Sequence, residues 1–145
     1  MNFEELNQLQ QEVDNDVTTE IATVCQTLEE FFDNDFDLIA TEVFKSAIKL
    51  GKDVVAFKLY FSYLDQETSN VYLQFSQFES SRTIGVITNN KPFSAHWQEY
   101  IKPCEDLIKT KLESFNLHFD MHEPTIEPIG GGEAPVILAT IYMKF

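Results

Sequence analysis

The sequence of residues 54–64 is VVAFKLYFSYL, and that of residues 71–79 is VYLQFSQFE. In both runs, apolar residues alternate with smaller or more polar ones, and this period of two is typical of a strand with one buried face. The alternating residues are Val55, Phe57, Leu59, Phe61 and Tyr63 in the first run, then Val71, Leu73 and Phe75 in the second. Because only the polar link DQETSN separates the runs, they predict an antiparallel hairpin. We expect this hairpin at the centre of a sheet that the helices cover.

Residues 1–51, which precede the hairpin, show helical periodicity. Their apolar residues recur mostly at intervals of three or four, which is typical of the buried stripe of a helix. Acidic breaks at 14–16 and 33–35 divide the stripe, and Asp16 is a suitable N-cap for a second helix. Gly51 stands where a glycine ends a helix. The predicted helices lie near 3–13, 17–32 and 36–50, and a continuous first and second helix is the alternative.

The chain after the hairpin predicts another strand at 83–88 and then a long amphipathic helix. Ser94 is its candidate N-cap, and its apolar positions are Trp97, Ile101, Cys104, Ile108, Leu112 and Phe115. Pro103 either kinks or breaks this helix, or stands in the first turn of a main helix that begins there.

Two further alternating runs, at 116–122 and 135–145, predict the last strands. The second run is apolar on both faces, which indicates an interior strand. Gly130–Gly132 lie between them and predict a long hairpin loop. They do not form a phosphate loop, because no Lys-Ser/Thr pair and no helix follow.

These elements predict a single α+β domain over residues 1–145. The expected order is ααα-βββ-α-ββ, with an acidic helical segment at 1–51 and the sheet with the long helix at 52–145. Runs of helices and strands without strict alternation favour a largely antiparallel sheet, here of about five strands, packed against the N-terminal helices and one long central helix.

Composition excludes several classes of protein. The chain has 145 residues and is 43% hydrophobic with 13 Phe, enough for one stable core. No apolar run approaches the roughly 18 residues that span a bilayer, and the acidic N-terminus is unlike a signal peptide, so we expect a cytoplasmic protein. Cys25 and Cys104 are expected to be buried free thiols, with a single disulfide as the alternative.

Charge is the most unusual property of the sequence. The net charge is −14, and residues 1–51 carry −10 of it because their twelve acids face only two lysines. Such a chain repels nucleic acid and anionic membranes and favours a basic protein partner. The alternative is that the acids only keep the protein in solution. The candidate partner-binding residues are Glu12, Asp14, Asp16, Glu29, Glu30, Asp33, Asp35 and Asp37.

The sharpest local motif is His118-x-Asp120-x-His122. On a strand, all three side chains share one face, but the outer Cα atoms lie about 13 Å apart, which is far for three ligands of one ion. The motif is therefore a weak metal candidate, and the polar face of an amphipathic strand is the alternative. No cofactor motif is found.

Three functions follow from these observations. The first is a non-enzymatic acidic binding module that occupies a basic surface, such as a nucleic-acid-binding site, as an inhibitor, immunity or anti-defence protein does. The second is a small acidic dimeric chaperone or assembly adaptor. In acidity and element order the chain resembles secretion-effector chaperones, although it has additional N-terminal helices and lacks their terminal helix. The third is a small metal- or ligand-binding enzyme that uses His118, Asp120 and His122.

Overall fold

The computed structural model describes residues 1–62, 69–76, 81–89, 97–129 and 132–143. Within these ranges the chain forms helices and strands in the order ααβββαβββ. The helices are α1 (Phe3–Asn34), α2 (Phe36–Lys49) and α3 (Trp97–Ser114). The strands are β1 (Val54–Ser62), β2 (Ser69–Ser76), β3 (Ser81–Asn89), β4 (His118–Met121), β5 (Thr125–Ile129) and β6 (Gly132–Tyr142).

The strands form one antiparallel sheet in the order β3-β2-β1-β6-β4, and β5 also pairs with β6. The predicted hairpin is confirmed as β1 and β2, in which Phe57 pairs with Phe75 and Leu59 with Leu73. β1 is the middle strand of this order. β6 is an interior strand, because β1 pairs with one edge while β4 and β5 pair with the other. The predicted α+β class is therefore confirmed.

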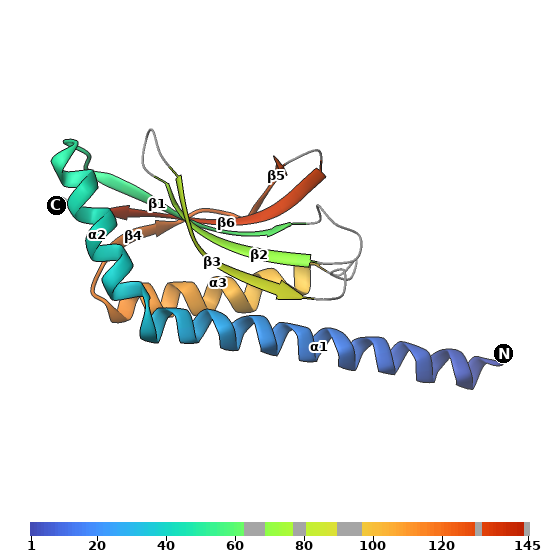
Figure 1. Cartoon of the computed structure of the whole chain (residues 1–145). Helices are drawn as coiled ribbons and strands as arrows, with labels where there is room; N and C mark the ends of the chain where they lie inside the picture. The colour runs from blue at the N-terminus through green and yellow to red at the C-terminus, as the bar shows by residue number, and fades with distance from the viewer. Residues whose placement is uncertain (63–68, 77–80, 90–96, 130–131, 144–145) are drawn as a thin grey trace.

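All three helices lie on one side of the sheet (Figure 1). The sheet face toward them is apolar, and Val55, Phe57 and Leu59 of β1 are almost completely buried there. Phe36 joins the layers, since its ring centroid lies 4.9 Å from that of Phe32 and 5.8 Å from that of Phe75. This core holds the helices against the sheet. The opposite sheet face is less completely buried, because Ala56, Lys58 and Tyr60 of β1 are half-buried there.

The helices predicted near 3–13 and 17–32 form one continuous helix, α1. The alternative prediction, that these two helices are continuous, is therefore correct. Asp16 does not cap a new helix but lies inside α1. The hydroxyls of Thr18 and Thr19 donate to the carbonyls of Asp14 and Asn15, four residues earlier. An Asp or Asn inside a helix costs at most about 0.7 kcal/mol relative to Ala, so three such residues do not end a long amphipathic helix.

The C-terminal part of the sheet is more extensive than the sequence predicted. β5 was expected to be a loop, and its pairing with β6 leaves only residues 130–131 between Ile129 and Gly132, so the expectation of a long loop was wrong. Pro128 is compatible with β5 because an edge strand needs hydrogen bonds on one side only. α3 continues through Pro103, whereas its expected N-cap, Ser94, lies outside the described residues.

Candidate protein-binding surface

The first half of α1 extends beyond the rest of the molecule (Figure 1). We call residues 1–16 the N-terminal arm. Every residue of the arm is exposed, and Val17 is the first buried residue of the chain. At a rise of about 1.5 Å per residue, the arm is about 24 Å long, or somewhat more than four helical turns.

Local interactions hold the arm in a helical conformation. Asn2 is the N-cap, and its side-chain oxygen accepts a hydrogen bond of 2.9 Å from the backbone N–H of Glu5. Glu4 and Glu5 place negative charge in the first turn, where the helix dipole favours it. Gln10 donates to Asp14 one turn later, at 3.0 Å. Because α1 continues into a packed segment, the arm also avoids the cost of nucleating a new helix.

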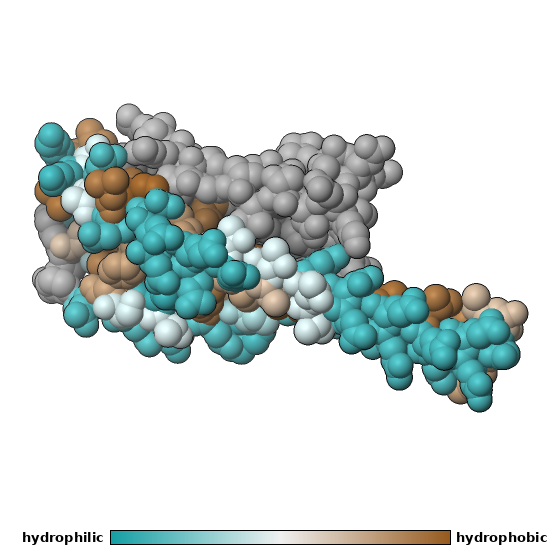
Figure 2. Space-filling model, turned by 60° about the horizontal axis from the view of Figure 1, so that its bottom comes forward, coloured by the Kyte–Doolittle hydropathy of each residue, from teal (hydrophilic) through white to brown (hydrophobic). Residues whose placement is uncertain are grey.

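The arm carries large apolar side chains that contact no core. We call them the arm stripe, which consists of Phe3 (76% exposed), Leu6 (53%), Leu9 (44%) and Val13 (45%). Their spacing of three or four residues places them on one side of the helix. Figure 2 shows hydrophobic residues on the arm among hydrophilic ones.

Acidic residues border the arm stripe. At about 100° per residue, Glu5, Glu12 and Asp16 lie on one side of the stripe and Asp14 lies on the other. Residues 1–44 contain no Lys, Arg or His, so no basic side chain of α1 balances these carboxylates. The arm is therefore an apolar stripe between acidic borders.

The other predicted acids lie at the far end of α1 and the start of α2. We call Glu29, Glu30, Asp33, Asp35 and Asp37 the junction cluster. Two of them bind within the chain, because Nζ of Lys111 on α3 lies 2.7 Å from Oδ1 of Asp33 and 3.7 Å from Oε1 of Glu29. The hydrogen bond to Asp33 is the main reason that the pKa of Lys111 is raised.

The eight predicted partner-binding residues therefore form two groups and not one patch. Glu12, Asp14 and Asp16 belong to the arm, while the other five belong to the junction cluster. Along the helix, Glu12 and Asp33 are about 30 Å apart. Because Glu29 and Asp33 attach α1 to α3, the acids of the arm are the better candidates for contact with a partner.

His118, Asp120 and His122 do share one face, as predicted, and that face is the solvent side of the sheet. All three are exposed. Asp120 accepts a hydrogen bond of 2.7 Å from the hydroxyl of Tyr142, and this bond raises the pKa of Tyr142. Nε2 of His122 lies 2.7 Å from Oγ1 of Thr140. Among the described residues, no group of three or more His, Cys, Asp or Glu side chains is placed to hold a metal ion.

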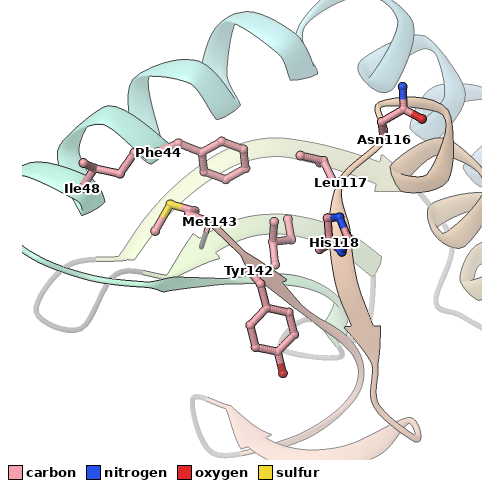
Figure 3. A pocket seen from close by; sticks show the side chains of 8 residues that line it. Phe44, Ile48, Asn116, Leu117, His118, Tyr142 and Met143 are labelled. Carbon is pink, nitrogen blue, oxygen red and sulfur yellow. The ribbon is translucent and has the colours of Figure 1, made fainter. Parts of the chain in front are cut away.

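A small cavity of about 230 Å³ lies where α2 meets the ends of β4 and β6. In Figure 3 the side chains of Phe44, Leu117 and Met143 extend toward one another, whereas the ring of Tyr142 points away. Most of the lining is apolar. The cavity is smaller than the roughly 300–1,000 Å³ of typical ligand pockets. Its described lining also does not bring several polar groups together at one point, as a specific ligand site does. It does not favour a small-molecule site.

Cys25 of α1 and Cys104 of α3 are both free thiols, and they form a hydrogen bond with each other. Cys104 is fully buried, whereas Cys25 is half-buried, which differs from the expectation that both are buried. The hydrogen bond from Cys104 lowers the pKa of Cys25 to about 7. The same bond, together with burial, raises the pKa of Cys104. No sequence pattern indicates this contact, because the two positions are far apart in the chain.

The chain was compared with known proteins. No family model matches the sequence, and no curated protein matches it. No helix in the described ranges combines the length and the hydropathy that crossing a bilayer requires. A functional proposal therefore depends on the surfaces described above.

Proposed function

We propose that this protein is a non-enzymatic, cytoplasmic binding module that captures a basic protein through its acidic helical segment. By occupying a basic surface, such as a nucleic-acid-binding site, it acts as an inhibitor in the manner of an immunity or anti-defence protein. One observation carries the proposal: α1 extends an acidic helix of about four turns, with an exposed apolar stripe, beyond the fold.

The charge of this segment gives the proposal its mechanism. A net charge of −10 on residues 1–51 attracts a basic partner over several ångströms and orients it before contact. Apolar side chains then supply the contact that is removed from water, and this burial governs how slowly the partner dissociates. The acids therefore control mainly the association rate and the arm stripe mainly the dissociation rate.

The test begins with capture of partners from a native lysate of the source, followed by mass spectrometry and purification of each candidate. The association rate is then measured between about 0.01 and 1 M salt, over which the Debye length falls from about 30 to about 3 Å. We expect the rate to fall steeply. A rate that does not change with salt would contradict electrostatic capture.

A matched pair of charge variants localises the effect. Glu12→Gln with Asp16→Asn removes two negative charges from the arm, and Glu113→Gln with Glu123→Gln removes two from exposed positions elsewhere. The arm variant should lower the association rate several-fold and the control variant much less. Equal effects of the two variants would show that only net charge matters.

The exposed arm stripe also fits the alternative of a dimeric chaperone or adaptor, in which a second copy covers it. Sedimentation of the purified protein separates the two functions. A dimer in the absence of any partner supports the adaptor, and a monomer supports the capture module.

A further inference from the structure

We propose that the arm pairs with an amphipathic helix of the partner, whose apolar stripe is flanked by Lys or Arg. This inference depends on the proposed function and adds two statements to it. The contact site is the arm stripe with its acidic borders, and the bound element is a basic helix.

The internal packing of α1 shows why a helix fits this surface. Beyond Val17 the stripe continues through Val24, Leu28 and Phe31, which are buried. There α1 packs beside another helix, α3, whose Ile101, Cys104, Ile108 and Leu112 are buried as well. The apolar stripe of α1 thus already packs against a helix over its second half, and the arm presents the same kind of stripe without one.

The register between α1 and α3 explains where this packing stops. The paired residues Cys25 with Cys104 and Asp33 with Lys111 have nearly the same separation in sequence, so the two helices run parallel. At this offset, Trp97, the first residue of α3, is level with the residues just after Val17. The arm therefore extends past the start of α3, and a partner helix that lies on it would continue the line of α3.

Charge complementarity identifies the partner helix as basic. The arm stripe has Glu5, Glu12 and Asp16 on one border and Asp14 on the other, and residues 1–44 contain no basic side chain. Two arms that paired with each other would bring these carboxylates together without a basic side chain to balance them, which is unfavourable. A helix with Lys or Arg beside its apolar stripe would instead form ion pairs on both borders, as flanking charges do in coiled coils.

The test uses the full chain and a synthetic helical peptide of about five turns. The peptide carries Leu at the spacing of the arm stripe and Lys beside it. One control peptide replaces Lys with Glu, and the other keeps the composition but scatters the Leu residues. Binding is measured by calorimetry at low and high salt. We expect that only the Lys peptide binds, that the two control peptides do not, and that high salt weakens the binding.

Two protein variants locate the contact. Leu6→Gln with Val13→Gln removes half of the arm stripe. Leu38→Gln with Ile126→Gln likewise replaces two exposed aliphatic side chains with Gln, at positions outside the arm. None of the four residues is buried, so both variants should fold. The arm variant should bind the Lys peptide at least tenfold more weakly than the control variant does.

Each other outcome overturns the inference. If both variants bind the Lys peptide equally and salt still weakens binding, the arm is not the site, although capture of basic partners stands. If the Glu peptide binds equally well, the basic character is wrong. If none of the peptides binds, the arm does not take a basic helix. If the parent chain and the control variant are dimers and the arm variant is a monomer, then a second copy of the chain covers the arm stripe. A partner that associates at a salt-independent rate would instead contradict the proposed function itself.

Discussion

The two halves of α1 carry the same pattern in opposite environments. In the anchored half, residues 17–34, the apolar stripe is buried against α3 and the sheet, and Leu28 has no exposed surface. In the arm, the stripe continues at similar spacing but is 44% to 76% exposed. Helical periodicity therefore specifies which side of a helix is apolar enough to pack against another element. The position of α3 specifies where that contact is provided within the chain.

Hydrogen exchange should give the largest difference between the halves. Amides of the anchored half exchange only when the domain unfolds, whereas amides of the arm exchange by fraying from the free end. For a domain with a stability of about 5–15 kcal/mol, protection in the anchored half should exceed that in the arm at least about a thousandfold. Mass spectrometry of deuterated peptides from residues 7–16 and 21–32 measures it. Equal protection would show that the arm is packed in solution, by a second copy or by another part of the chain.

A matched pair of leucine truncations should give the next largest difference. Leu28→Ala removes a fully buried side chain and should lower the free energy of unfolding by about 2–5 kcal/mol. Leu6→Ala shortens an exposed side chain of the same helix and should change the free energy of unfolding by less than about 0.5 kcal/mol. Urea unfolding measures both variants. A loss of more than about 2 kcal/mol in Leu6→Ala would end the distinction between the arm and the anchored half.

Most of the fold could be predicted from the sequence because its periodic signals are local. Alternation at 54–64 and 71–79 predicted β1 and β2, and the apolar character of both faces of 135–145 predicted an interior strand. β5 was missed because Pro124 and Pro128 mark a loop in most contexts. An edge position in the sheet removes the cost of a proline, and an edge position is decided by the tertiary fold.

Less of the candidate surface could be predicted, because its limits depend on distant contacts. The acidic residues of 1–51 can be found by counting charges. That Glu29 and Asp33 pair with Lys111 could not be foreseen, because Asp33 and Lys111 are 78 positions apart in the sequence. The stripe from Phe3 to Phe31 gives no sign of where burial begins. That point is set by the register of α3 against α1, which no short stretch of sequence contains.

The contact of Cys25 with Cys104 offers a smaller but more local test of that register. Because Cys104 donates a hydrogen bond that lowers the pKa of Cys25 to about 7, alkylation of Cys25 by iodoacetamide should increase with pH around a midpoint near 7. Cys104→Ala removes the donor and leaves the burial and the nearby Glu29, which both raise the pKa of Cys25. The midpoint should therefore shift upward, toward the ordinary value of 9.0 or beyond.

At pH 7, the Cys104→Ala variant should react several-fold more slowly than the parent chain. The fraction of Cys25 that is thiolate at pH 7 should fall by a larger factor than the reaction rate does. The reason is that a thiolate of higher pKa is intrinsically more nucleophilic, which offsets part of the loss. Cys25→Ser is the control, and it should remain unlabelled in the native state because Cys104 is buried. If the parent chain already titrates near 9, Cys104 does not donate to Cys25 in solution. A shifted register of α3 against α1 would be one cause, and it would move the border between the arm and the anchored half along the helix, and with it the length of stripe that is left for a partner.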